Sequence, residues 1–484
     1  MTLRHRRIWL LIGLFVLLRW VASFSFGLGG DEAYYVLYGR KLALSYFDHP
    51  PLVGWFQALF HYPLTAIFGL HDWIARVPAI VLFAAASYLS YRLIYSVTRN
   101  ERVGMLCLLA LNSSVLLNVL GLMMLPDCLL LVTIQLLIFT LMAIDEKPKH
   151  WRNWLWLGVV LGVSGLAKYT AFLFLFPTAW FLVSRRLLNK RTWPKLLAAA
   201  ALGLLIVSPV IIWNAEHDWI SFRYQGDHVV GAGVPINWKG FFLSVGRQFL
   251  AYGPPLFLVS FFGLWRAFRS RHLILRLSSW FGLVLALFFG ASALYKVSLP
   301  HWTSPFFVLF IPIGFYFMVL DIRKKWERWL ALGVLGFSLA MVACAFGLVI
   351  LKPVRFDTLR SPFRDVGDYA ELMKRANEEL AKDPAQLKVI GITNWSLASR
   401  IMYYNLPYSS ETKVFDNRVD QFGLWNPKDY LGGDVLFLIN YFLPRDVEQY
   451  YHCGQIEPVG TVDLPFAGTV VDRYKMVWCR RLAK

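Results

Sequence analysis

The feature that most constrains this chain is a series of apolar runs, each about long enough to cross a lipid bilayer. A membrane-spanning helix needs about 20 mainly apolar residues, and such runs recur from residue 8 to residue 351 of the 484-residue chain. We predict eleven spans, near residues 8–26, 73–97, 103–123, 128–144, 154–167, 169–184, 196–212, 241–264, 277–295, 305–320 and 329–351. No cleavage site of small residues follows the first run, so we expect it to be retained. The fold class is a polytopic α-helical membrane protein.

Basic residues are clustered in every second gap between these runs. The clusters are Arg4, Arg6, Arg7; Arg99, Arg102; Lys147, Lys149, Arg152; Arg185, Arg186, Lys190, Arg191, Lys195; Arg266, Arg269, Arg271, Arg276; and Arg323, Lys324, Lys325, Arg328. Because loops rich in Lys and Arg stay in the cytoplasm, we expect a cytoplasmic N-terminus and, after eleven spans, a C-terminus on the outer face. The net charge of +19 is then mostly a topology signal, and we expect no nucleic-acid partner.

The composition changes after residue 351, where charged residues alternate with short β-like runs. We therefore divide the chain into a transmembrane domain, residues 1–351 with a first outer loop at 27–72, and a small soluble α/β domain, residues 352–484. Strands are predicted near 388–393, 435–440 and 468–477, and an amphipathic helix over 365–382. Cys453 and Cys479 both lie in this domain, and the sequence leaves open whether they form a disulfide.

Carboxylates gather in the gaps on the outer face. The first outer loop carries Asp31-Glu32 and, further on, Asp48-His49, while Asp127 follows Pro126 in the short gap after the third run. Tyr34, Tyr38 and Leu42 are spaced four residues apart, which predicts a short interfacial helix between the two acidic sites. For Asp31 alone, a helix-capping role is the simpler interpretation. Several carboxylates at one depth favour a functional site instead, because ionisable groups beside a membrane are costly.

Cations lie at the same depth. Lys168 interrupts two apolar runs, and Arg247 and Lys296 lie near the outer ends of later ones. Such cations either hold a phosphate or extend to the interface with no ligand. Arg19, late in the first run, either extends in the same way or supports the first-loop site.

The gap after the seventh run mixes aromatic, acidic and amide side chains. Trp213, Asn214 and His217 suit the faces and hydroxyl groups of a sugar, but they equally suit an interfacial loop without a ligand. The histidines show no zinc-binding spacing, and we find neither a phosphate-binding P-loop nor a dinucleotide fingerprint.

Two first-loop motifs resemble those of a known family. Asp-Glu-Ala-Tyr-Tyr at 31–35, followed by Tyr-Phe-Asp-His-Pro-Pro-Leu at 46–52, resembles the GT-C superfamily of membrane glycosyltransferases. The branch that is most similar contains bacterial proteins that look like protein O-mannosyltransferases and lipid A aminoarabinose transferases. Further matching segments are 76–78, 126–127, 165–170, 213–219 and 300–302.

The resemblance implies inverting transfer of a sugar from a polyprenyl-phosphate donor to an acceptor hydroxyl. The acceptor would be an envelope glycolipid such as lipid A or lipopolysaccharide core, or another envelope glycan or protein. The protein would then lie in a bacterial inner membrane, with its C-terminal domain in the periplasm.

The resemblance also implies roles for individual residues. Asp31 would be the acceptor base, with Glu32 beside it. His49 stands where aminoarabinose transferases commonly carry Lys, which leaves open whether the phosphate is held there or by Lys168, Arg247 or Lys296. The candidates for binding sugar or acceptor are Tyr34, Tyr35, Asp48, Trp213, Asn214, His217 and His301. Asp127 and Asp48 are the candidate ligands for Mg²⁺ or Mn²⁺, although base catalysis alone needs no metal.

Two other classes of protein compete with the enzyme. A transporter or flippase for lipid-linked sugars also places charges near membrane helices, but it favours charges at the membrane midplane and two repeated halves. Here the charges gather at one face and no repeat is visible. A non-catalytic assembly scaffold would use the C-terminal domain for binding, and changes to first-loop carboxylates would then leave glycan chemistry intact.

Overall fold

The computed structural model describes residues 3–229, 235–352, 365, 367–382, 389–416, 418–425, 433–444 and 452–483. Three sets of residues from predicted segments lie outside this part: 230–234 of the gap after the seventh predicted span, 366 of the predicted amphipathic helix and 388 of the first predicted strand. The chain forms two compact units. The first unit comprises residues 1–21, 43–56 and 76–346, and the second comprises 22–42, 57–75 and 347–484. This division differs from a boundary at residue 352, because two segments of the first outer loop belong with the C-terminal region.

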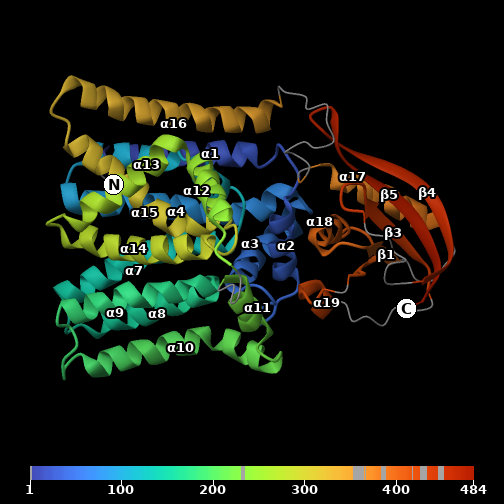
Figure 1. The fold of residues 1–484 in the computed structure, drawn as a ribbon, viewed down its shortest axis with the longest axis horizontal. Helices are drawn as coiled ribbons and strands as arrows, with labels where there is room; N and C mark the ends of the chain where they lie inside the picture. The colour runs from blue at the N-terminus through green and yellow to red at the C-terminus, as the bar shows by residue number, and fades with distance from the viewer. Residues whose placement is uncertain are drawn as a thin grey trace. The chain divides into compact units, whose positions relative to one another are not determined.

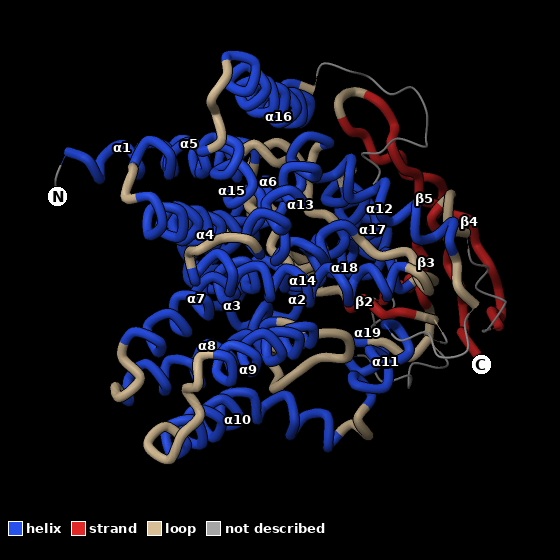
Figure 2. Tube along the Cα trace, turned by 60° about the vertical axis from the view of Figure 1, so that its left-hand side comes forward, coloured by secondary structure: helices blue, strands red, loops and turns tan. Residues whose placement is uncertain are grey.

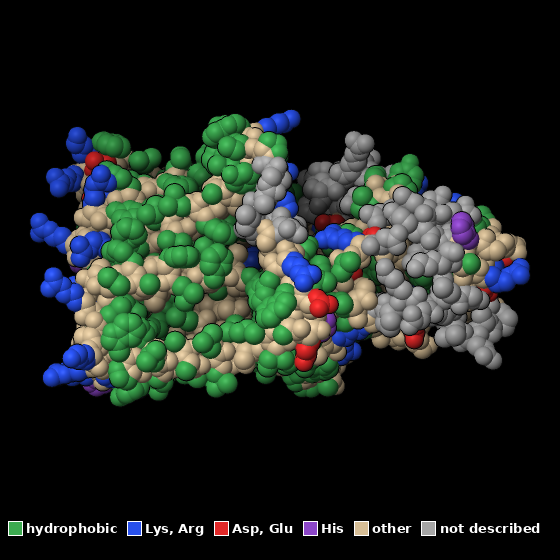
Figure 3. Space-filling view, turned by 60° about the horizontal axis from the view of Figure 1, so that its bottom comes forward, with side chains coloured by type: hydrophobic (Ala, Val, Ile, Leu, Met, Phe, Trp, Pro, Cys, Tyr) green, Lys and Arg blue, Asp and Glu red, His purple; other side chains and the backbone are tan. Residues whose placement is uncertain are grey.

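The first unit is helical (Figures 1 and 2). Its described helices, some of which extend into the second unit, are α1 (Leu3–Ala22), α4 (Asp72–Thr98), α5 (Glu101–Asn112), α6 (Val115–Leu120), α7 (Pro126–Glu146), α8 (Trp151–Ala167), η1 (Tyr169–Phe174), α9 (Leu175–Ser184), α10 (Trp193–Glu216), α11 (Ile220–Val229), α12 (Trp238–Tyr252), α13 (Pro254–Phe268), α14 (Leu273–Ala293), η2 (Pro300–Thr303), α15 (Ser304–Leu320) and α16 (Lys325–Leu351). Lys and Arg side chains gather at one end of the unit, and hydrophobic side chains cover its flank (Figure 3).

Six helices in the described part are long and apolar enough to cross a membrane, or seven if one bent pair counts as a single span. The protein is thus a multi-pass membrane protein, but the predicted count of eleven spans is not confirmed. The predicted span at 241–264 is bent by 105° between α12 and α13. Gly253 at this bend has a φ of 94°, and Pro254 and Pro255 follow it. Glycine adopts this backbone conformation without strain, and proline cannot continue the preceding helix.

The predicted span at 103–123 is likewise interrupted, between α5 and α6. The side chain that lies beside this break is Arg19 of α1, which is 1% exposed. Its guanidinium donates to Asn112 Oδ1 at 2.7 Å and to Asn118 Oδ1 at 2.8 Å. It also lies 4.4 Å from the centre of the Phe83 ring. A charge among apolar helices needs such partners, so Arg19 ties α1 to α5 and α6 and does not extend to the interface.

Helices α8 and α10 approach each other closely through small residues. A Cβ atom added at Gly158 would lie 2.3 Å from the Ala199 carbonyl oxygen, and one at Gly203 would lie 3.2 Å from the Gly158 carbonyl oxygen. Small residues at such an interface let the two backbones touch, which is the main source of attraction between helices in lipid.

The second unit combines the first outer loop with the C-terminal region. Its described elements are α2 (Gly30–Arg40), most of α3 (Leu52–Phe68), α17 (Tyr369–Lys382), β1 (Val389–Ile392), α18 (Trp395–Tyr404), β2 (Glu411–Val414), α19 (Gln421–Trp425), β3 (Val435–Asn440), β4 (His452–Phe466) and β5 (Thr469–Ala483). The predicted strands near 388–393, 435–440 and 468–477 correspond to β1, β3 and β5. The predicted amphipathic helix is α17, and the predicted interfacial helix is α2.

The strands form one sheet in the order β2-β1-β3-β5-β4. β1 is parallel to β2 and β3, whereas β5 is antiparallel to both β3 and β4. Alternate residues face opposite sides, so Ile390 and Leu436 join a core with α2, α17 and α18, while Val389 and Val435 join a second cluster. Cys453 and Cys479 form a disulfide between β4 and β5. This settles the pairing that the sequence left open.

Gly158→Val is expected to lower the stability of the first unit by about 1–3 kcal/mol, because its side chain would collide with α10. The matched control is Gly336→Val in α16, where an added Cβ meets nothing within 4 Å. Thermal unfolding in detergent measures both variants. Equal melting temperatures for Gly158→Val and the wild type would contradict the close packing of α8 on α10.

Candidate active site

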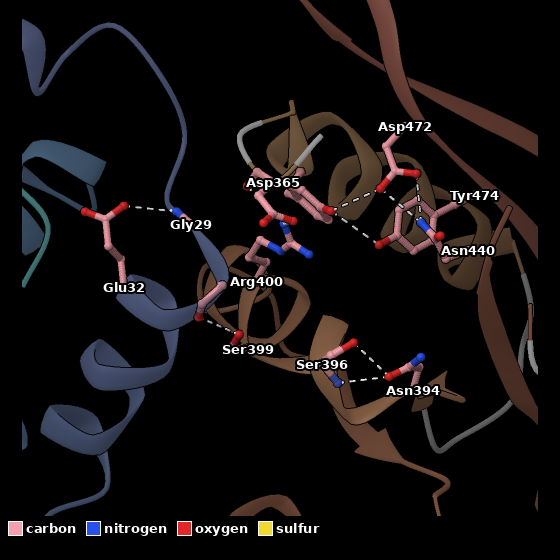
Figure 4. A network of polar contacts seen from close by, with 12 residues as sticks. Gly29, Glu32, Asp365, Asn394, Ser396, Ser399, Arg400, Asn440, Asp472 and Tyr474 are labelled. Carbon is pink, nitrogen blue, oxygen red and sulfur yellow. Dashed lines mark hydrogen bonds and ion pairs between the residues drawn. The ribbon is translucent and has the colours of Figure 1, made fainter. Parts of the chain in front are cut away.

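Helix α2 carries the two acidic residues of the first loop, and the structure gives them different surroundings. The helix begins at Gly30, and Glu32 Oε2 accepts a hydrogen bond from the Gly29 amide at 3.0 Å (Figure 4). Glu32 is 1% exposed, whereas Asp31 is exposed in the first turn. Glu32 therefore stabilises the start of the helix. Asp31 is exposed to solvent, and the N-cap residue is Gly29.

Helix α18 fixes the start of α2. Ser399 Oγ donates to the Gly30 carbonyl at 2.8 Å (Figure 4). The Tyr404 hydroxyl accepts from the Leu28 amide at 2.8 Å and donates to Asp72 Oδ2 at 2.7 Å. Burial, with Asp72 nearby, raises the pKa of Tyr404 well above its ordinary value of 10, so the hydroxyl stays protonated and keeps donating. These contacts hold the backbone just before and at the start of α2, next to Asp31.

Tyr34 and Tyr35, predicted to bind sugar or acceptor, take part in packing within the second unit. The Tyr34 ring lies 5.4 Å from Phe422 and 6.2 Å from Trp425, both of α19. Tyr35 is 5% exposed. The two rings therefore contribute to the contact of α2 with its neighbours.

Asp127, Lys168 and His301 come together in the first unit. Asp127 is in the first turn of α7, and Lys168 lies between α8 and η1. Lys168 Nζ is 2.8 Å from both carboxylate oxygens of Asp127. His301 Nε2 is 4.0 Å from Asp127 Oδ2, and Lys168 Nζ lies 5.9 Å from the Trp302 ring centre. The sequence identified these residues separately, and only the fold shows that Asp127 and Lys168 form a buried pair.

The segment that contains Asp48 and His49 is held by α11. Gln225 Nε2 donates to the Asp48 carbonyl at 2.7 Å, and Ser221 Oγ donates to the Tyr46 carbonyl at 3.0 Å. Asp48 and His49 are half-buried. His49 lies close enough to His301 to act on it electrostatically, as do Asp127 and Lys168. His49 therefore belongs to the surroundings of the Asp127–Lys168 pair.

Trp213, Asn214 and His217 lie at the C-terminal end of α10. The Trp213 and His217 rings are stacked with centres 3.9 Å apart, and Trp213 is 6% exposed. Asn214 is buried, and its backbone carbonyl accepts a hydrogen bond from the Trp219 amide at 2.7 Å. These contacts give Trp213 and Asn214 a structural role at the turn into α11.

The remaining predicted phosphate ligands lie on other elements. Arg247 is exposed on α12, and Lys296 is half-buried after α14. Tyr252 of α12, which the sequence analysis did not select, donates from its hydroxyl to the Pro300 carbonyl at 3.0 Å and so fixes the segment that carries His301.

The residues proposed as metal ligands do not form a metal-binding cluster within the described ranges. No group of three or more His, Cys, Asp or Glu side chains arranged to hold a metal occurs there. Both Asp127 oxygens already accept from the Lys168 ammonium. The residues at Asp127 therefore do not fit a divalent cation held by protein side chains, and the mechanism proposed below includes no metal ion.

An apolar cavity of about 700 Å³ lies among α8, η1, α9 and α10. Its wall contains Gly162, Gly165 and Gly203, at which α8 and α10 approach each other closely, and the aromatic rings of Tyr169 and Phe222. Tyr169 directly follows Lys168 in the chain. The cavity suits a hydrocarbon chain, because its lining is almost wholly apolar.

Comparisons with known proteins agree with this architecture. Residues 48–213 match the family model described as dolichyl-phosphate-mannose-protein mannosyltransferase. ArnT from Cupriavidus metallidurans, in its apo crystal structure, is 15% identical with a TM-score of 0.62, and the match covers 99% of this chain and 98% of that one. No curated protein matches the chain by sequence.

Two other solved structures are similar to smaller parts of the chain. Oligosaccharyltransferase AglB from Archaeoglobus fulgidus is 10% identical with a TM-score of 0.47, over 83% of this chain and 63% of that one. The Pmt1-Pmt2 protein O-mannosyltransferase complex from S. cerevisiae is 15% identical with a TM-score of 0.35, over 46% and 34%.

The chain thus has a fold like that of ArnT, and the GT-C-like fold that the sequence predicted is confirmed. The full-length similarity to ArnT includes both the helical part and the small C-terminal sheet.

The buried Asp127–Lys168 pair is expected to show strong energetic coupling. Asp127→Asn or Lys168→Met leaves one buried charge unpaired, which is expected to lower the free energy of unfolding by about 3–5 kcal/mol. The double variant leaves no unpaired charge, so its loss of stability should be smaller than the sum of the two single losses. A double-mutant cycle from unfolding in detergent measures the coupling.

The control cycle uses Asp145 and Arg185, a pair with an N–O distance of 2.7 Å in which Arg185 is exposed. Its coupling is expected to stay below about 1 kcal/mol. Additive effects at Asp127 and Lys168 would show that the two charges do not depend on each other.

Proposed function

We propose that the protein is an inverting glycosyltransferase that moves a sugar from a polyprenyl-phosphate donor to an acceptor hydroxyl at the outer face of a bacterial inner membrane. The observation that carries the proposal is the fixed Lys168 ammonium, which directly precedes Tyr169 in the wall of the apolar cavity. The isoprenoid chain of the donor needs an apolar binding cavity within the membrane, and its phosphate needs a cation next to that cavity.

Lys168 is suited to the donor phosphate by its remaining hydrogen-bonding capacity. An ammonium group has three N–H donors, and Asp127 accepts at two oxygens. The third donor is then available for a phosphate oxygen. Asp127 positions Lys168, and His301 and His49 supply further polar groups near the pair.

Asp31 is the residue that we assign as the base. It draws the proton from the acceptor hydroxyl as that oxygen attacks the anomeric carbon. The bond from the anomeric carbon to the phosphate oxygen breaks, and its electron pair stays on the departing lipid phosphate, whose charge Lys168 stabilises. Attack from the side opposite the leaving group inverts the configuration. Glu32 contributes by holding the first turn of α2, not by taking a proton.

The acceptor and the orientation are further parts of this proposal. Basic side chains at one end of the first unit support a cytoplasmic placement of that end (Figure 3). The N-terminus would then be cytoplasmic, and the second unit would lie in the periplasm. An envelope glycolipid such as lipid A or lipopolysaccharide core is the favoured acceptor, with another envelope glycan or a protein as alternatives.

Asp31→Asn is expected to reduce turnover by at least about 100-fold, because the amide cannot accept the proton. Binding of polyprenyl phosphate and the melting temperature should stay at the wild-type values, since Asp31 is exposed. The matched variant is Glu32→Gln, whose side-chain oxygen still accepts from Gly29 and which should retain most turnover.

Transfer of radiolabelled sugar in proteoliposomes measures turnover, and titration with polyprenyl phosphate measures binding. Wild-type turnover in Asp31→Asn would refute the assignment of the base. Movement of the labelled lipid across the bilayer without sugar transfer would identify a flippase instead.

A further inference from the structure

The second unit contains a cavity that is separate from the candidate site residues described above. It has a volume of about 650 Å³, and the lining residues within the described part of the chain belong to the second unit. They come from five places in the chain: residues 23–27, 70–73, 352 with 367–370, 403–408 and 465–467. Asp31 is not among them. A cavity of this size accommodates one or two sugar rings.

The charges in the wall favour a hydroxyl-rich ligand over an anionic one. Among the described residues, the lining contains two carboxylates, Asp72 and Asp368, and one ammonium group, that of Lys352. Asp72 is held in place by the Tyr404 hydroxyl at 2.7 Å, and Asp368 Oδ1 accepts from the Glu371 amide at 3.1 Å. Fixed carboxylates accept hydrogen bonds from hydroxyl groups but repel phosphates.

Aromatic rings supply the other part of the wall. Phe24 is 54% exposed and lies 5.9 Å from the Trp73 ring, and Tyr408 is 37% exposed. Tyr404, Phe466 and His71 also line the cavity. Flat rings present apolar faces to the C–H groups of a sugar ring, while carboxylates at the edge take its hydroxyls.

The cavity borders the ends of membrane helices. Residues 23–27 follow α1, Asp72 and Trp73 begin α4, and Lys352 follows α16. Of these helices, α4 and α16 are long and apolar enough to cross a membrane. A ligand in the cavity can therefore remain attached to a lipid whose chains stay in the bilayer.

We propose that this cavity binds the saccharide part of a membrane glycolipid. The inference rests on the proposed function, for which it would provide a binding site for the acceptor. The residues that recognise the sugar are Asp72, Asp368 and Tyr408, with Trp73 and Phe24 as stacking surfaces.

Calorimetric titration of the full-length protein in glycolipid-free nanodiscs tests the site directly. The probe is dodecyl maltoside, compared with free maltose and dodecyl phosphate. We expect dodecyl maltoside to bind at least about tenfold more tightly than either. Equal binding of maltose would overturn the lipid-linked part of the inference. Tighter binding of dodecyl phosphate, or no binding of dodecyl maltoside, would overturn the saccharide site.

Two variants locate the binding. Tyr408→Ala and Asp368→Asn should each weaken dodecyl maltoside binding at least about tenfold, and Asn still caps α17 as Asp does. The matched control is Tyr441→Ala, since Tyr441 is 61% exposed on the same unit but does not line the cavity. Unchanged affinity in both cavity variants would overturn the assignment.

The same titration separates this inference from the proposed function. Asp31→Asn should bind dodecyl maltoside as the wild type does. Binding of dodecyl maltoside by a wild-type protein that shows no transferase activity would overturn the proposed function alone. Full transferase activity with wild-type acceptor KM in Tyr408→Ala and Asp368→Asn would overturn the acceptor role of the cavity alone.

Discussion

Helix α2 packs into the same hydrophobic core as α17, α18 and the C-terminal sheet, and the rest of the second unit depends on this contact. Leu37 of α2 is buried in that core with Leu397 and Ile401 of α18. Ser399 and Tyr404 add hydrogen bonds to the backbone just before and at the start of α2. Because a small sheet must cover one face to be stable, the first outer loop completes the C-terminal unit. The position of Asp31 is consequently set by residues more than 360 positions later in the chain.

In the first unit, charge is stabilised by pairing inside an apolar environment. Asp127 and Lys168 are 1% and 7% exposed, and removing two charges from water costs several kcal/mol per ion unless they are well paired. The buried charge of Arg19 is likewise stabilised, in this case by hydrogen bonds to the neutral side chains of Asn112 and Asn118. The Asp127–Lys168 pair differs because the next residue, Tyr169, lines an apolar cavity. We propose a chemical use for the cation that is fixed beside this cavity, whereas the contacts of Arg19 connect α1 to α5 and α6.

Local patterns in the sequence were sufficient to predict α2, α17 and the strands β1, β3 and β5, because the two helices show a helical spacing of apolar residues and the strands are short β-like runs between charged residues. The break at Gly253 was missed, since the apolar run continues through it and conceals the bend. The Asp127–Lys168 pair joins residues 41 positions apart, and the contact of α2 with α18 joins still more distant ones. Such contacts arise from tertiary packing, which no local pattern contains. Glu32 illustrates the limit, because the sequence shows its acidity but not that it is buried and accepts a hydrogen bond from the Gly29 amide.

The most direct test of the central claim is mass spectrometry of envelope glycolipids and glycoproteins from source cells that lack the gene. The cells are complemented with the wild type or with Asp31→Asn at matched protein levels. If the protein is the proposed transferase, one sugar-sized mass disappears in the deletion, returns with the wild type and stays absent with Asp31→Asn. The molecule that changes mass identifies the acceptor. Full restoration by Asp31→Asn would contradict the account.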